Sequence, residues 1–178
     1  MEGGWYNAPE AMAMISKLNA IGENSVRFDR SSVAEVAVVV DEKSLLYLGL
    51  GNDLYYPWII EQPMEFGRMG TPADWILIDD IGKSNQYKMY VMLNMLHVTP
   101  EHKALISKLQ NGAAKSIVWV YAPGLMTDKI DVANCESVTG IKLKLLRDKA
   151  PLFVEINDKG HDFFPDLYRG FKYGTQNK

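Results

Sequence analysis

The sequence has little or none of several features on which whole classes of protein depend. Its 178 residues include a single cysteine, so an internal disulfide framework and a multi-cysteine metal cluster are both excluded. The 19 basic residues are outnumbered by 22 acidic ones, whereas a nucleic-acid binder usually carries a basic patch. No apolar run reaches the roughly 18 residues that a membrane-spanning helix needs. We therefore expect no disulfide, no nucleic-acid partner and no membrane span.

The N-terminal segment MEGGWYNAPE lacks the basic and apolar regions of a signal peptide. If the protein is exported, its signal lies outside this chain, and the compartment stays open. Apolar bulk, by contrast, is plentiful, because 47% of the residues are hydrophobic and the chain has four Trp, nine Tyr and six Phe. That bulk suffices for a core and excludes disorder of the whole chain. The length predicts one domain with room for an appendage.

Strands alternate with helices after residue 33. Apolar runs predict strands at 36–40, 73–79, within 87–98 and at 116–124, with further candidates at 141–146 and 151–156. Helices are predicted at 57–69, 99–111 and 131–138. Pro63 should kink the first of these helices, and Thr99-Pro100 is a strong start for the second. This alternation predicts an α/β fold, a three-layer α/β/α flavodoxin-like sandwich with a mainly parallel sheet.

An extra N-terminal helix, predicted over residues 7–28, precedes that unit. Asn7 can cap it with Glu10 in a capping box, and Pro9 is tolerated in the first turn. Its apolar stripe, which includes Ile15 and Leu18, is narrow. Such a helix needs a partner surface to be stable.

In a doubly wound sheet, binding sites lie at the carboxyl ends of the strands. The polar or aromatic residues expected at those ends are Asp41, Glu42, Asn94 and Tyr121. These four residues define a candidate ligand-binding crevice. Asp79 and Asp80 are adjacent, so on an extended strand they would point to opposite faces. We interpret them as a polar strand end rather than as a catalytic carboxylate pair.

Known chemistries of this fold find no match at the strand ends. A phosphoacceptor receiver needs an aspartate where Asn94 stands, and no Gly-rich phosphate loop or Walker pattern is present. An amidotransferase elbow would fall at Ala122-Pro123, which offers no nucleophile. Cys135 has no flanking glycines and is interpreted as a small buried residue. We predict no catalytic residue and no cofactor.

The histidines likewise suggest no metal site. His97, His102 and His161 have neither HExxH nor HxH spacing. We expect His102 to be solvated in the first turn of its helix and His97 to be structural. The Met-rich stretch MYVMLNML is interpreted as core filling. The aromatic residues Trp58, Trp75 and Trp119 are assigned to the core or an interface, and Tyr55, Tyr56 and Trp58 are candidate interface aromatics.

Four stretches carry a family resemblance. They are GGWYNAPEAMAMISKL, DRSSVAEVAVVVDEKSLLYL, GTPADWILIDDI and YKMYVMLNMLHVTPEHKALISKLQNGAAKSIVWVYAPGLM. Over about residues 1–145 the chain resembles the glutamine-amidotransferase-like domain, of β-galactosidase trimerisation type, in bacterial glycoside hydrolases near family 42. In those proteins the domain follows a catalytic (β/α)8 barrel and is understood as non-catalytic.

The resemblance implies a domain plan and a function. Residues 1–31 would be the last barrel helix and a linker, residues 32–158 the amidotransferase-like domain, and residues 159–178 a tail leading to a following domain. The chain would be an accessory and oligomerisation domain of a β-galactosidase-like hydrolase, with the parent's other domains and a homo-oligomer as partners. A signal peptide on the parent would make it periplasmic or secreted.

Two rival functions remain. One is a stand-alone module that binds a sugar or another small molecule in the crevice at Asp41, Glu42, Asn94 and Tyr121. The other is an amidotransferase-like enzyme acting through Cys135.

Overall fold

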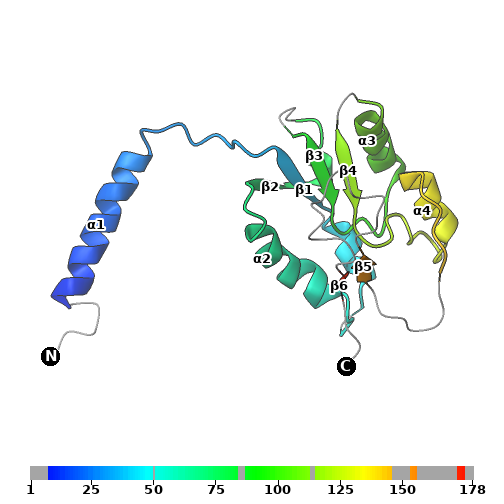
Figure 1. The fold of residues 1–178 in the computed structure, drawn as a ribbon, viewed down its shortest axis with the longest axis horizontal. Helices are drawn as coiled ribbons and strands as arrows, with labels where there is room; N and C mark the ends of the chain where they lie inside the picture. Colours follow the sequence, from blue (N-terminus) through cyan, green and yellow to red (C-terminus); the bar gives the residue numbers. More distant parts are fainter. Residues whose placement is uncertain are drawn as a thin grey trace. The chain divides into compact units, whose positions relative to one another are not determined.

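The chain divides into two compact units, Met1–Ile141 and Lys142–Lys178. The computed structural model describes residues 8–49, 51–83, 87–112 and 115–145, and the backbone of 153–155 and 172–174 (Figure 1). The first unit holds a four-stranded sheet with its helices. In the second unit, β5 (Phe153–Glu155) pairs antiparallel with β6 (Lys172–Gly174). β5 confirms the strand expected at 151–156, whereas β6 was not predicted.

The sheet of the first unit has the strand order β2-β1-β3-β4, and every pair is parallel. Its strands are β1 (Val36–Val40), β2 (Ala73–Leu77), β3 (Met89–Met92) and β4 (Ser116–Trp119). β1 and β3 lie in the middle, which explains their unbroken apolar sequences, because a central parallel strand is covered on both faces. The predicted α/β sandwich with a mainly parallel sheet is confirmed.

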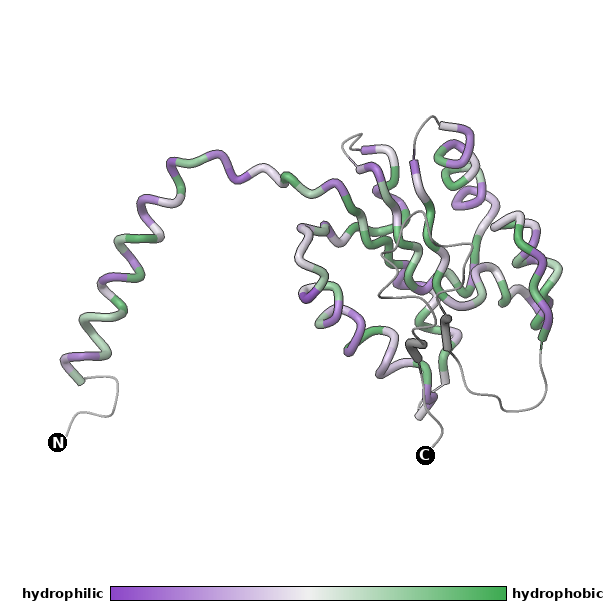
Figure 2. The backbone as a smooth tube through the Cα atoms, in the orientation of Figure 1, coloured by the Kyte–Doolittle hydropathy of each residue, from purple (hydrophilic) through white to green (hydrophobic). Residues whose placement is uncertain are grey.

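Two apolar clusters form the core, one on each face of this sheet. Ile106 and Leu109 of α3 (Pro100–Gln110) and Val138 of α4 (Val132–Thr139) pack on one face with Val39 and Met92. The other cluster gathers Val38 and Leu93 around Trp58 of the π-helix η3 (Tyr56–Glu61), with Phe66 of α2 (Gln62–Gly67) beside them. The strands are accordingly the most hydrophobic part of the trace (Figure 2).

The aromatic residues of η3 and its N-cap, Tyr55, divide between this core and the surface. Trp58, which we assigned to the core or an interface, is only 5% exposed and belongs to the chain's own core. Tyr55 and Tyr56, by contrast, are 45% and 58% exposed. Trp58 packs against Val38 and Leu93 of the sheet, and Tyr56 faces away from it because residues two apart on a helix do not share a face.

Local signals in the sequence placed most helix ends correctly. The Thr99 hydroxyl accepts a hydrogen bond from the N–H of His102, which caps α3, and the Asp131 carboxylate caps α4 in the same way. Gly140 ends α4 in the left-handed region, at φ 75°, which costs glycine little. The helical segment near Pro63 changes from π to α hydrogen bonding at Gln62, one residue before the proline.

The N-terminal helix α1 (Pro9–Ser25) has no buried residue. Its N-cap is Ala8, which cannot cap with its side chain, and Asn7 lies outside the described residues. Apolar side chains remain exposed along it, including Met14 at 65% and Leu18 at 60%. In the described part of the chain no helix is long and apolar enough to cross a membrane.

Two expected strands differ from the structure. β2 ends at Leu77, and Ile78–Asp80 form a 3-10 turn, η4, so Asp79 and Asp80 do not lie on an extended strand. Residues 141–145 form no strand, and Ile141 and Leu145 stay more than half exposed. An alternating pattern suits a half-buried strand, but a strand also needs a neighbour to pair with.

Candidate functional site

The site expected from the sequence is the carboxyl edge of the sheet between β1 and β3. From β1 the chain passes outward to β2 and later returns to β3 on the other side, so the strand order reverses between these two neighbours. Such a switch point is where doubly wound folds usually open a binding crevice. Asp41 and Asn94 occupy it, two residues beyond the last register pair, Val39 and Met92.

Two hydrogen bonds close this switch point. The Asn94 side-chain oxygen accepts from the Asp41 N–H at 2.8 Å, and its Nδ2 donates to the Asp41 carbonyl, also at 2.8 Å. The Asn94 amide thus continues the β1–β3 pairing by one further step. Asp41 and Asn94 are 3% and 1% exposed. The Asn94 side-chain amide and the Asp41 backbone groups, which could otherwise bind a ligand here, are therefore paired with each other.

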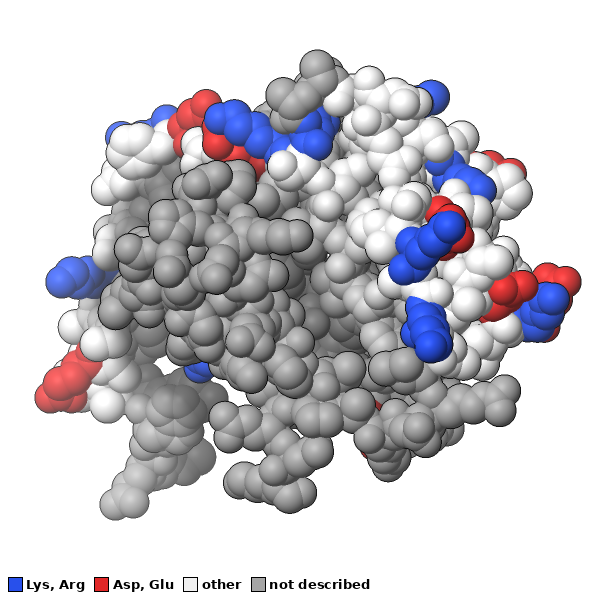
Figure 3. Space-filling view, turned by 45° about the vertical axis from the view of Figure 1, so that its right-hand side comes forward, with Lys and Arg blue, Asp and Glu red and all other residues white. Residues whose placement is uncertain are grey.

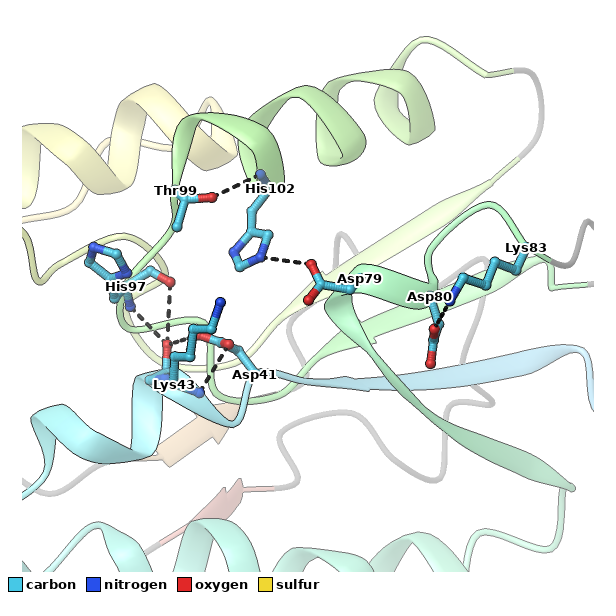
Figure 4. Close-up of polar contacts among 9 residues, drawn as sticks. Asp41, Lys43, Asp79, Asp80, Lys83, His97, Thr99 and His102 are labelled. Atoms are coloured by element: carbon cyan, nitrogen blue, oxygen red, sulfur yellow. Dashed lines mark hydrogen bonds and ion pairs between the residues drawn. The ribbon is translucent and has the colours of Figure 1, made fainter.

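The Asp41 carboxylate is held by the start of η2 (Lys43–Tyr47), a 3-10 helix (Figure 4). Its Oδ2 accepts from the Ser44 N–H at 2.9 Å and from the Ser44 hydroxyl at 2.6 Å, and its Oδ1 accepts from the Lys43 N–H at 3.2 Å. Ser44 is fully buried, and its Oγ also accepts from the His97 N–H at 3.0 Å. Buried polar groups require such partners, and here the chain itself provides them.

The other two predicted crevice residues do not join this network. Glu42 is exposed, one residue after Asp41. Tyr121 is 52% exposed, and its ring packs edge-on against Trp58, with centroids 5.2 Å apart at 84°. Among the described residues, hydrogen bonds link only Asp41 and Asn94 of the four. Binding of a ligand by the four together stays a prediction.

Tyr121 has an unusual backbone, with φ at 66°. It is the single non-glycine residue with positive φ in the described part of the chain. A left-handed backbone conformation at a residue other than glycine costs about 1–3 kcal/mol, and it persists where the surrounding structure enforces it. Enzymes of related folds hold a nucleophile on such a strained turn after a strand. Here the strained residue of the turn is a tyrosine. It lies one residue before the Ala122-Pro123 corner, where we had expected the turn that would carry a nucleophile.

A second pair on this edge was not predicted. His102, expected in solvent, is 4% exposed, and its Nε2 lies 3.1 Å from Oδ1 of Asp79. Its Nδ1 is buried, with no hydrogen-bond partner among the described residues. The 3-10 turn η4 brings Asp79 to the first turn of α3, which sequence spacing does not reveal. The neighbouring Asp80 is paired with Lys83, whose hydrogen bond lowers the pKa of the Asp80 carboxyl.

No metal centre emerges from these groups. Within the described residues, no three side chains of the His, Cys, Asp or Glu type lie close enough to hold an ion. His97 stacks on Tyr47, with centroids 4.9 Å apart at 16°. His161 lies outside the described residues.

Cys135 is fully buried in α4, as expected of a small packing residue. Burial raises the pKa of its thiol, so the reactive thiolate is scarce at neutral pH. We expect iodoacetamide to leave the native chain unmodified at pH 8 and to alkylate it readily in denaturant, as measured by intact mass. A Cys135→Ser variant is the blank. Complete alkylation of the native chain at the rate of a free thiol would contradict this expectation.

Comparisons with known proteins were made with both the sequence and the structure. No family model and no curated protein match the sequence. Among solved structures, the chain is similar to a β-galactosidase from Bifidobacterium adolescentis, with 16% sequence identity and a TM-score of 0.47. The similarity covers 83% of this chain and 71% of that one.

Proposed function

We propose that this chain is a non-catalytic accessory and oligomerisation domain of a multidomain glycoside hydrolase. The Asp41–Asn94 pair carries the non-catalytic part of the proposal. At the switch point, where this fold usually binds a substrate, both side chains are buried and hydrogen-bonded within the chain. The sequence resemblance of residues 1–145 supplies the parent class.

Three further observations support the proposal. Tyr121 stands on the strained turn after β4, where a nucleophile would be expected. The thiol of Cys135 is buried. The apolar side chains of α1 are exposed, as suits a helix whose packing partner is another domain. In the parent, residues 1–31 would end the barrel, 32–158 would be this domain, and 159–178 would lead onward.

An activity assay on the chain tests the non-catalytic role. We expect no release of nitrophenol from p-nitrophenyl β-D-galactoside or other aryl glycosides above the blank. Glu42→Gln and Asp79→Asn remove exposed carboxylates from the carboxyl edge, and Glu35→Gln removes one that precedes β1 as the matched control. Turnover lost in either edge variant but kept in Glu35→Gln would contradict the proposal. Turnover equal in all three variants would indicate a contaminating hydrolase.

Reading the gene on both sides of this segment tests the parent. We expect the open frame to continue upstream into a (β/α)8 pattern with two glutamates at strand ends. A frame that encodes this segment alone would refute the accessory role.

A further inference from the structure

A cavity of about 590 Å³ opens beside the switch point, on the α3 and α4 side. Its volume lies within the range usual for small-molecule sites, about 300–1,000 Å³. The wall combines the loops that follow β1, β3 and β4 with two helices. Its polar and aromatic members include Tyr47, His97, Lys103, Asp128, Asn134 and Ser137.

One wall is a stacked pair of rings. Tyr47 and His97 lie nearly parallel, with centroids 4.9 Å apart, and Tyr47 is 41% exposed. The buried Ser44 hydroxyl fixes the backbone of His97, because it accepts from the His97 N–H at 3.0 Å while its own proton goes to the Asp41 carboxylate. The Asp41–Ser44 network therefore holds the aromatic wall in place. A preorganised ring offers a flat apolar surface at little entropic cost.

Another part of the wall presents neutral hydrogen-bonding groups from the loop after β4 and from α4. The Asn134 amide nitrogen donates to the Thr127 hydroxyl at 3.4 Å, and that hydroxyl donates to the Lys129 carbonyl at 3.2 Å. This orientation leaves the side-chain oxygen Oδ1 of Asn134 to accept from a ligand, since the backbone carbonyl of Asn134 accepts from the Ser137 hydroxyl at 2.8 Å. Ser137 lines the same wall. Amides and hydroxyls both donate and accept, as do the hydroxyls of a polyol.

The charges on the cavity wall balance. Lys103 and Asp128 each contribute one charge, of opposite sign. Acidic and basic side chains are also interspersed over the described residues of the face drawn in Figure 3, where neither sign dominates. Such a wall favours neither anions nor cations, because charges of opposite sign leave only a weak electrostatic field outside it.

We propose that this cavity binds a neutral polyhydroxylated small molecule of about the size of a monosaccharide. The C–H face of such a ligand packs on Tyr47, and its hydroxyls pair with Asn134 and with the charged groups on either side. The inference does not rest on the accessory role proposed above, because it uses only the geometry of the cavity. It also names residues other than those predicted for the crevice.

Titration calorimetry and amide NMR on the full chain test the site. The probes are D-galactose and D-glucose, with D-galacturonate and D-glucosamine as charged analogues. We expect one neutral hexose to bind and each charged analogue to bind more weakly. Tyr47→Ala and Asn134→Ala should each raise the Kd for that neutral hexose by about tenfold or more, which corresponds to about 1.4 kcal/mol.

Tyr55→Ala is the matched control, because Tyr55 is similarly exposed but does not line the cavity. The Kd of the Tyr55→Ala variant for the hexose should equal that of the unmodified chain. Amide spectra of all variants establish that they are folded. No heat and no shift perturbation with either hexose at about 50 mM would overturn the proposal. An equal loss of binding in Tyr55→Ala, or tighter binding of a charged analogue, would also overturn it.

Discussion

Replacing Asn94 by alanine is expected to lower the free energy of unfolding by about 3 kcal/mol, because it leaves two buried backbone groups without partners. These groups are the N–H and the carbonyl of Asp41, which both pair with the Asn94 amide at 2.8 Å. Asn94 itself is 1% exposed, so the two groups are left in the interior and not in contact with bulk water. Urea unfolding followed by circular dichroism measures the change.

Asn52→Ala is the control for this experiment. The Asn52 side-chain oxygen also accepts from a backbone N–H, that of Leu54 at 2.7 Å, but at an exposed site. Water can replace that bond, so the loss should stay below about 1 kcal/mol. Similar losses in the two variants would show that the Asp41–Asn94 pair contributes no more than an ordinary surface turn. The switch point would then be free to open for a ligand.

Met92→Ala is expected to destabilise the chain by about 2–5 kcal/mol, since it creates a cavity in a closely packed core. Met92 ends β3, is fully buried and packs in the cluster under α3. Met89 begins the same strand and is 37% exposed, which makes Met89→Ala the matched control. It should cost less than about 1 kcal/mol.

The same denaturant titration checks both methionine variants, and a constant m-value indicates that the unfolded state is unchanged. Equal losses at the two positions would contradict the burial of Met92. They would also undermine the interpretation of the Met-rich stretch as core filling, which the burial of Met92 and Met95 confirms.

Much of the fold was predictable because its signals are local. An unbroken apolar run predicts a central parallel strand, as at β1, and Thr99-Pro100 predicts the start of α3. Gly140 marks the end of α4 for the same reason, since only glycine adopts a left-handed backbone at little cost. The strand predicted at 141–146 was wrong over the described residues 141–145, because an alternating pattern does not show whether a neighbouring strand is available for pairing.

The candidate site was predictable only in part. The topology of a parallel sheet brings Asp41 and Asn94 to one edge, so both could be named in advance. Their use was not predictable, because a carboxylate and an amide at a strand end can serve a ligand or the fold. The wall of the cavity was missed, since Tyr47, His97 and Asn134 are far apart in sequence and share no motif.

The sequence by itself determined the α/β class, the strand order along the chain, most helix ends and the absence of known catalytic motifs at the strand ends. These follow from periodicity, caps and residue chemistry, which act over a few neighbours. Only the tertiary structure decided that Asn94 pairs with Asp41, that His102 turns inward to Asp79, and that Tyr121 has a left-handed backbone. Each of these depends on contacts between strands or turns distant in sequence, and register and packing set those contacts when the sheet assembles.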